Sequence, residues 1–315
     1  MKKKLVIVLS IIILIIILLP VFTGDLEKET LNQETRAKLD GSFIELSNGY
    51  THYELKGPVD GKTIILVHGN AAPYFTWDNN IDALINAGFR VLRYDVYGHG
   101  FSDRPDMKKY NRELYDKQLV ELKEKLDINE PVYIVGTSQG GSISTYFTAS
   151  HPEEVEKLAL LSPLFDDYIG KGLVNLFKIN YFGDYLMSII GDKIGTDPSN
   201  VLYSDDKKQE LINKLNKQIN YKGKKKAVLA NMRGDALDDA TIYYEQLNQM
   251  DIPVFLTWGE NDKSNTRESM ENLCKLVPKT QYHEIKVASH LAHYEFPEKI
   301  NSLLIDFLKS EETSN

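Results

Sequence analysis

Cysteine is almost absent from the sequence. Cys274 is the single cysteine, so no disulfide can form within the chain, whatever compartment the protein occupies. The surrounding stretch RESMENLCKLV has helical spacing and places no histidine or aspartate beside the sulfur, which predicts a buried structural thiol. Clusters with metal-ligand spacing and glycine-rich phosphate loops are also missing, so neither a metal nor another cofactor is expected.

Positive charge is in deficit. The formal net charge of the 315 residues is −8 at pH 7, and removing the lysines at positions 2, 3 and 4 from this value leaves −11. A surface of this sign disfavours nucleic acid or anionic lipid as the main partner. With 42% apolar residues the chain can still bury a full core, and its length fits one large domain with an insertion.

Polar residues are nearly missing between Leu5 and Phe22, where Ser10 is the only one. A helix of this length spans about 27 Å, close to the hydrocarbon thickness of a bilayer. Residues 1–23 are therefore predicted to be an uncleaved transmembrane helix. The alternative is a cleaved signal sequence and a secreted protein, but Phe22 spoils the best cleavage site before Gly24. Three lysines ahead of the span predict a cytoplasmic N-terminus and an extracytoplasmic body.

Strand-like and helix-like segments alternate after a polar stretch at 24–41, which is predicted to be a stalk. SFIELSNGYTHYELKG predicts a hairpin around Asn48-Gly49, and apolar strands follow at intervals, each separated from the next by a helical segment. This alternation predicts an α/β fold with a mostly parallel sheet of about eight strands, flanked by helices. The strand pattern lapses at 164–245, which predicts a helical cap inserted into a core formed by 42–163 and 246–312.

A candidate nucleophile stands in Gly136-Thr137-Ser138-Gln139-Gly140, which matches the pattern G-x-S-x-G. A predicted strand runs into Ser138 and a predicted helix leaves it, which indicates the sharp turn that presents a serine hydroxyl above a sheet. Glycines two positions to either side let the backbone and the helix approach where a Cβ atom would clash. The alternative is that Ser138 only caps the following helix.

A serine hydroxyl is a poor nucleophile at neutral pH and needs a base that is oriented by a carboxylate. His290 lies between the last predicted strand and the last helix and is predicted to be the base, with His293 as the alternative. Asp262 follows the strand PVFLTWG and is predicted to be the acid, which gives the chain order Ser, Asp, His. Three other residues are alternatives for the acid: Glu260, Asp166 and Asp167.

The oxyanion of a tetrahedral intermediate needs donors that are fixed before the reaction begins. The backbone N–H groups of Gln139 and Asn70 are predicted to supply them, with Ala71 as the alternative to Asn70. The remaining histidines are predicted to stabilise turns or to occupy surface or strand positions: His68 and His99 in glycine turns, and His52, His151 and His283 elsewhere.

Five motifs carry a resemblance to the α/β-hydrolase family: HGN at 68–70, DVYGHGFSDRP at 95–105, GTSQGG at 136–141, WGEND at 258–262 and SHLAHYEFPE at 289–298. In relatives the histidine of a G-H-x-x-x-x-E-x-P stretch is the base, and 289–297 fits this pattern with serine in place of glycine. The resemblance also implies a helical cap after the sixth strand. The HGN turn is similar to that of haloalkane dehalogenases, but their nucleophile is an aspartate, so Ser138 excludes dehalogenase and epoxide hydrolase activity.

Hydrolysis of a small-molecule ester or lipid-like substrate through an acyl-enzyme is the predicted function. Four cap residues suggest an apolar substrate pocket, although such a stripe is also typical of a cap's own core: Tyr181, Phe182, Tyr185 and Leu186. The alternatives are hydrolysis of an amide or of a C–C bond of the meta-cleavage type. Paired cap arginines would favour the C–C reaction, whereas Arg233 is the cap's only arginine. A non-catalytic binding module on the same fold is an alternative of another class, and the oligomeric state stays open.

Overall fold

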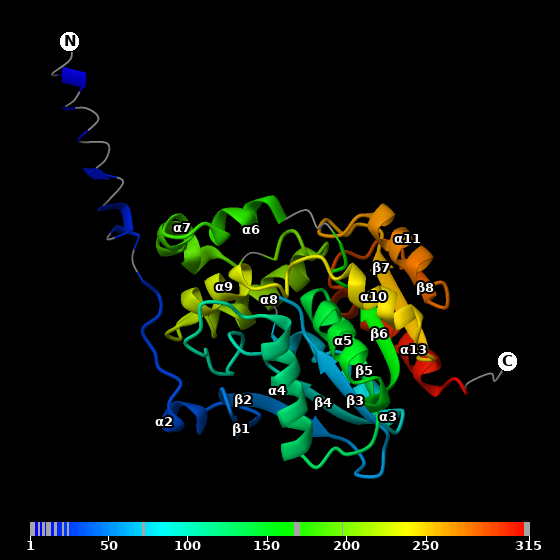
Figure 1. Cartoon of the computed structure of the whole chain (residues 1–315). Helices are drawn as coiled ribbons and strands as arrows, with labels where there is room; N and C mark the ends of the chain where they lie inside the picture. Colours follow the sequence, from blue (N-terminus) through cyan, green and yellow to red (C-terminus); the bar gives the residue numbers. More distant parts are fainter. Residues whose placement is uncertain are drawn as a thin grey trace.

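The computed structural model describes residues 25–70, 73–166, 171–196 and 198–311, together with the short stretches 4–5, 14–15, 18–20 and 22–23 and the single residues 7 and 10. Within these residues an eight-stranded sheet forms the centre of the body, and helices cover both of its faces (Figure 1). A further group of helices lies over one end of the sheet, beside the N-terminal segment (Figure 1). The α/β fold and the mostly parallel sheet expected from the sequence are thereby confirmed.

The strands follow the order β1-β2-β4-β3-β5-β6-β7-β8 across the sheet. The first two form the antiparallel hairpin expected around Asn48-Gly49, and β2 also runs antiparallel to β4. From β4 onward all neighbours are parallel. The strand bounds are β1 Ser42–Leu46, β2 Gly49–Lys56, β3 Thr63–Val67, β4 Arg90–Tyr94, β5 Val132–Thr137, β6 Val155–Leu161, β7 Val254–Gly259 and β8 Gln281–Ile285.

The central strands are buried on both faces, because every residue of β3, β5 and β7 is buried. This explains why these segments are mostly apolar instead of alternating regularly with polar residues. One face packs against α3 (Ile81–Asn86) and α13 (Pro297–Lys309). The other face packs against four helices: α4 (Arg112–Lys125), α5 (Gln139–Ser150), α10 (Thr241–Asn248) and α11 (Arg267–Leu276).

Among the residues described between β6 and α10, four α-helices form the layer over the end of the sheet, which we call the cap. They are α6 (Lys171–Lys178), α7 (Phe182–Ile190), α8 (Asp205–Asn216) and α9 (Lys224–Arg233). Apolar side chains from α6, α7 and α9 form a small core of their own, while α8 packs on the body through Leu211 and Leu215. Short elements complete the fold: α2 (Gln33–Arg36), α12 (Ala292–Glu295), and the 3-10 turns η1 (Tyr74–Trp77), η2 (Pro152–Glu154) and η3 (Gly191–Lys193).

The segment before the sheet lies against the cap and the body. Asp25 forms an ion pair with Lys225 of α9 at 2.8 Å, and the Glu27 carboxylate accepts hydrogen bonds from the backbone of Gly223 and Lys225. Arg36 forms an ion pair with Asp103 of the core. About half of the predicted anchor at 1–23 falls outside the described residues. Among the residues that are described, no helix combines the length and the apolarity needed to cross a bilayer.

Candidate active site

Ser138 occupies the turn between β5 and α5 with φ 54° and ψ −122°, a backbone conformation that serine rarely adopts. The flanking glycines make this turn feasible. A Cβ atom on Gly136 would lie 2.4 Å from the Gly140 carbonyl oxygen, and one on Gly140 would lie 2.3 Å from the Val67 carbonyl oxygen. Any side chain at either position would force the strand and the helix apart, so the G-x-S-x-G spacing is required by close packing.

The loop after β3 reaches the same point of the structure. A Cβ atom on Gly69 would lie 2.9 Å from the Cβ atom of Ser138, so only glycine lets this loop pass so close to the serine. The following residue is Asn70, whose backbone N–H was expected to bind an oxyanion. The HGN motif predicts a turn here. Glycine is needed at position 69 because Ser138, which is far away in the sequence, lies against it.

His290 and Asp262 form a buried pair. The Nδ1 atom of His290 lies 2.8 Å from the Oδ2 atom of Asp262, and the Oδ1 atom accepts hydrogen bonds from the backbone N–H groups of Ser264 and Asn265 at 2.7 and 3.1 Å. Burial alone raises the pKa of Asp262, but the charge of His290 and these hydrogen bonds hold that pKa below its usual value. The ionised carboxylate therefore fixes the ring through Nδ1 and leaves Nε2 as the nitrogen able to accept a proton.

A cavity of ≈ 230 Å³ brings the predicted residues together. Ser138, His290, Gly69 and Asn70 line its polar end, and Asp262 lies behind His290. Apolar side chains, mainly from the cap and from the loops beside it, form much of the remaining wall: Leu164, Val174, Val201, Leu211, Leu215, Leu237 and Leu291. The arrangement suits attack on a carbonyl group that is held by an apolar substrate body.

The alternative acids and bases lie elsewhere. His293 is fully buried against Trp77, with ring centroids 4.3 Å apart, and burial lowers the pKa of its imidazole to about 3. Glu260 is exposed and forms an ion pair with Lys286, while Asp166 accepts a hydrogen bond from Ser269. None of these three lines the cavity. Two further alternatives, Asp167 and Ala71, fall outside the described residues.

A cap residue that no motif had indicated joins the two predicted oxyanion residues. Asn231 of α9 is buried, and its Oδ1 atom accepts hydrogen bonds from Gln139 Nε2 and from the Tyr115 hydroxyl, both at 2.8 Å. Its Nδ2 atom donates to Gln139 Oε1 at 3.1 Å and to Asn70 Oδ1 at 3.3 Å. The side chains of Asn70 and Gln139 are thus fixed by one amide from the cap.

Replacing Asn231 by alanine is expected to lower kcat about tenfold while changing KM much less. The physical reason is that the amides of Asn70 and Gln139 lose part of their positioning, and preorganised donors act mainly on the transition state. Steady-state kinetics of Asn231→Ala would measure the effect. Tyr115→Phe is the control, since it removes one hydrogen bond to Asn231 and leaves the Asn231 amide in place beside Asn70 and Gln139. Equal losses of kcat in the two variants would contradict the positioning role.

Three histidines surround the loop after β3. His68 contacts the Gly69 carbonyl through Nδ1 at 2.7 Å and accepts a hydrogen bond from the Val96 N–H at Nε2, which fixes the turn as expected. His99 Nε2 lies 3.1 Å from Asn70 Oδ1, and burial lowers the pKa of His99 to about 3. His52, expected at a surface or strand position, lies in β2 but is fully buried, 2.7 Å from the Asp95 carboxylate.

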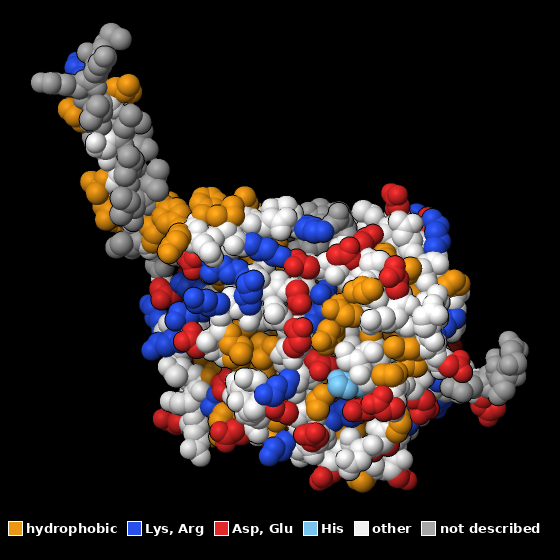
Figure 2. Space-filling view, viewed as in Figure 1, with side chains coloured by type: hydrophobic (Ala, Val, Ile, Leu, Met, Phe, Trp, Pro, Cys, Tyr) orange, Lys and Arg blue, Asp and Glu red, His pale blue; other side chains and the backbone are white. Residues whose placement is uncertain are grey.

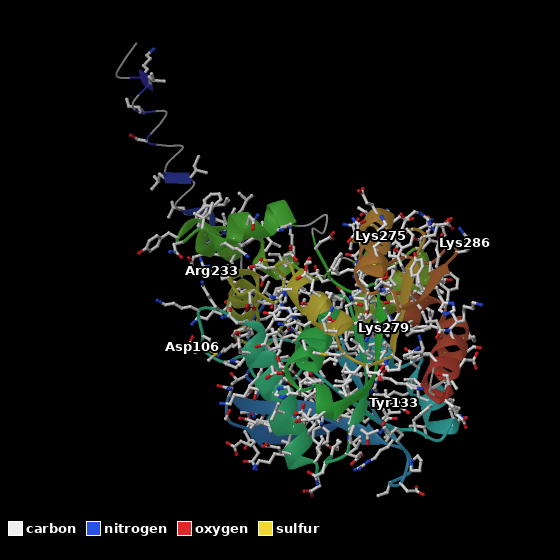
Figure 3. All side chains as sticks on the ribbon, turned by 45° about the vertical axis from the view of Figure 1, so that its right-hand side comes forward. Asp106, Tyr133, Arg233, Lys275, Lys279 and Lys286 are labelled. Carbon is white, nitrogen blue, oxygen red and sulfur yellow. The ribbon has the colours of Figure 1, made fainter. Side chains whose placement is uncertain are left out.

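Of the two interpretations of the four cap residues, the substrate pocket is wrong, and the cap's own core is confirmed for Leu186. Tyr181 and Phe182 are exposed, and Leu186 packs inside the small core of the cap. None of them, nor Tyr185, is among the residues that line the cavity. Arg233, labelled in Figure 3, forms an ion pair with Asp184 at 2.7 Å and likewise does not line the cavity. The spacing of apolar residues along α7 does not by itself show which side of the helix faces the body.

The fold and the site together define a hydrolase, with a serine turn after a central parallel strand and a His–Asp pair carried by the loops after β8 and β7. A family model described as alpha/beta hydrolase fold matches residues 62–297, and the chain belongs to this family.

The chain is similar to known proteins whose names give several different activities. A 2-hydroxy-6-oxononadienedioate/2-hydroxy-6-oxononatrienedioate hydrolase from Cupriavidus pinatubonensis is 25% identical over 284 residues, which are 84% of this chain and 94% of that protein. An enol-lactonase from Burkholderia xenovorans is 20% identical with a TM-score of 0.70, covering 85% and 100% of the two chains. A thermophilic esterase from Thermogutta terrifontis is 19% identical with a TM-score of 0.71, covering 85% and 98%. The two structures are similar to this chain in fold.

Proposed function

We propose that the protein is a serine hydrolase in which Ser138 attacks the carbonyl carbon of a small-molecule substrate. His290 takes the hydroxyl proton through Nε2, and Asp262 holds the ring and stabilises the imidazolium. The backbone N–H groups of Asn70 and Gln139 bind the oxyanion. The observation that carries this proposal is that a serine in a strained turn and a histidine paired with a buried carboxylate line one cavity.

The bond that best fits the known relatives is a C–C bond next to a carbonyl, as in substrates of the meta-cleavage type. The relative from Cupriavidus pinatubonensis is named for a dienedioate, a substrate with two carboxylates. We propose a related acidic substrate for this chain. After Ser138 adds to the carbonyl, the C–C bond breaks, and its electron pair passes to the carbon of the leaving fragment, which His290 protonates. Water then releases the acyl group.

Two cations near the active-site cavity support an acidic substrate. Arg104 and Lys224 line a second cavity that shares Gly195 and Leu215 with the first. Burial lowers the pKa of both side chains, and among the described residues neither has a carboxylate within ion-pair distance. Their hydrogen bonds go instead to backbone carbonyls, those of Ser102 and Gly100 for Arg104 and those of Gly191 and Ile194 for Lys224. Carboxylates lie farther away, Asp95, Asp103 and Glu27 from Arg104 and Asp192 and Glu27 from Lys224, and a partly buried cation that forms no ion pair can bind an anion.

Ester hydrolysis is the second candidate function, and the apolar wall of the cavity favours it. The described residues that line the active-site cavity include no arginine or lysine. An ester with an aliphatic acyl chain would fit this wall without the help of Arg104. The same Ser138 chemistry would form an acyl-enzyme that water hydrolyses.

Arg104→Gln separates the two candidates. If the substrate is a dienedioate, we expect KM for it to rise about 10- to 100-fold, since a charge-assisted hydrogen bond contributes roughly 1.5–3 kcal/mol. Turnover of p-nitrophenyl butyrate should stay unchanged. Steady-state kinetics with both substrates would measure this, with Arg104→Lys to retain the charge. Arg267→Gln is the control, since Arg267 pairs with Glu284 and lines neither cavity. Equal effects of Arg104→Gln on both substrates would contradict the acidic-substrate proposal.

We also propose that residues 1–23 attach the protein to a membrane, with the hydrolase body on the extracytoplasmic side. The support is the apolar run between Leu5 and Phe22 and the lysines ahead of it. Alkaline extraction of membranes and protease accessibility in intact cells test the attachment and the orientation. Recovery of the full-length chain in the aqueous fraction would overturn the proposal.

A further inference from the structure

The outer side of α6 and α7 carries an exposed apolar surface. Tyr181 is 89% exposed and Leu173 60% exposed, and other large apolar side chains stand beside them in the sequence. We call this set the cap patch: Leu173, Leu176, Ile179, Tyr181, Phe182 and Ile190. Figure 2 shows apolar atoms gathered on this side of the body, where the N-terminal segment meets it. Single exposed apolar residues are ordinary, but a contiguous group marks an interaction surface.

The same helices are apolar on their inner side as well. Val174 of α6 lines the active-site cavity, and Phe177 and Met187 are buried in the small core of the cap. The cap patch is therefore additional to the residues that fold the cap. A helix that is apolar on two sides is expected where both sides are covered.

The N-terminal apolar segment ends at this surface. The Thr23 hydroxyl donates a hydrogen bond to the Ser188 carbonyl of α7 at 3.3 Å. The Leu26 N–H donates to the Asp192 carboxylate at 3.4 Å, and Asp25 forms its ion pair with Lys225. The described residues on either side of position 24 are thus bound to the cap.

A lysine-rich stretch lies next to the cap patch. The sequence between 213 and 226 contains six lysines and no acidic residue, although the chain as a whole is acidic. Lys217, Lys222 and Lys226 of this stretch are exposed, and so is Lys193 in η3. Basic side chains gather below the apolar atoms on this side of the body in Figure 2. Apolar side chains bordered by lysines match the interface of a bilayer that contains anionic lipid.

We propose that the cap patch rests in the interfacial region of the bilayer to which residues 1–23 attach, with the neighbouring lysines at the lipid phosphates. The inference rests on the proposed membrane attachment and is independent of which bond Ser138 cleaves. It places α6 between the lipid and the active-site cavity, since Leu173 and Leu176 face outward while Val174 lines the cavity.

Tryptophan fluorescence of the full-length chain tests this position. The native Trp77 and Trp258 are buried, so a tryptophan placed in the cap patch reports on its own surroundings. Tyr181→Trp is to be reconstituted in phosphatidylcholine–phosphatidylglycerol vesicles with plain or brominated acyl chains. We expect the added emission to be at least twofold lower in the brominated vesicles. Val59→Trp, in the exposed loop between β2 and β3, is the control and should not be quenched.

Three measurements distinguish the proposed membrane attachment, the proposed position of the cap patch and the proposed chemistry of Ser138. Flotation of the chain with vesicles reports the attachment, quenching reports the cap patch, and turnover of a water-soluble substrate reports Ser138 chemistry. Flotation without quenching of Tyr181→Trp would overturn the position of the cap alone, and failure to float would overturn both membrane proposals. Blue-shifted emission that is not quenched and depends on protein concentration would show a second copy on the patch, and would also overturn it.

A variant with charges in the cap patch completes the test. Leu173→Asp combined with Leu176→Asp, in the Tyr181→Trp background, should abolish the quenching because buried carboxylates are costly in lipid. Neither leucine lines the active-site cavity, so turnover of the water-soluble substrate should stay unchanged. Quenching that persists in this variant would overturn the proposal.

Discussion

Replacing Ser138 by alanine is expected to lower kcat by a factor on the order of 10⁶, because covalent attack on the substrate carbonyl is lost entirely. The residual rate would come from the oxyanion donors and from substrate binding. Steady-state kinetics on a dienedioate and on p-nitrophenyl esters, combined with labelling by a fluorophosphonate, would measure the loss. KM should change little, since the hydroxyl contributes little to ground-state binding.

The control for this variant is Ser150→Ala, at the exposed C-terminal end of the same helix α5. It should retain full activity and full labelling. Labelling that survives in Ser138→Ala would place the nucleophile elsewhere and would contradict the proposed site. If the wild type is labelled but turns over neither substrate, the protein has an activated serine, and the proposals that it cleaves a C–C bond or an ester would both be wrong.

Replacing Asp262 by asparagine is expected to lower kcat by about 10⁴. An asparagine amide can present an N–H toward Nδ1 of His290, which would favour the tautomer that carries its proton on Nε2 and cannot accept the Ser138 proton. The measurement is kcat over a range of pH. Asp166→Asn is the control, since its carboxylate is bonded to Ser269 and not to His290. A loss of less than tenfold in Asp262→Asn would show that another group orients the ring.

The same substitution has a pH-dependent effect on stability. The pKa of Asp262 in the folded protein lies below its usual value, so the carboxylate stabilises the fold at every pH above its unfolded pKa of about 3.9. That contribution decreases as the pH falls through the lower, folded pKa. The difference in urea midpoint between the wild type and Asp262→Asn should therefore be constant between pH 7 and 5 and should shrink near pH 3.

Local patterns in the sequence predicted the sheet well. Asn48-Gly49 predicted the β1–β2 hairpin, and β3, β5 and β7 were visible as short apolar runs between helical segments. The G-x-S-x-G spacing predicted the turn at Ser138 because its cause is local, namely the close packing of β5 against α5. His290 and Asp262 followed from the places of their loops in the α/β alternation.

Features that depend on long-range packing could not be predicted in this way. Asn231 reaches Asn70 and Gln139 only because α9 folds back over the sheet, and no motif around it indicates a partner. His52 is buried because β2 pairs with β4, which brings it against Asp95. One missed contact did have a local signal, since Asp262 and Ser264 are spaced as in a turn closed by an aspartate side chain.

Asn231 ties the cap to the two residues that are proposed to bind the oxyanion. A cap that lifts from the sheet would carry Asn231 away and release the side chains of Asn70 and Gln139 at the same moment. The raised form would then admit substrate but catalyse slowly, and the lowered form would catalyse but exclude exchange with solvent. Loading and turnover would alternate as two phases of one movement, and a compound wedged beneath α9 would inhibit the enzyme without touching Ser138.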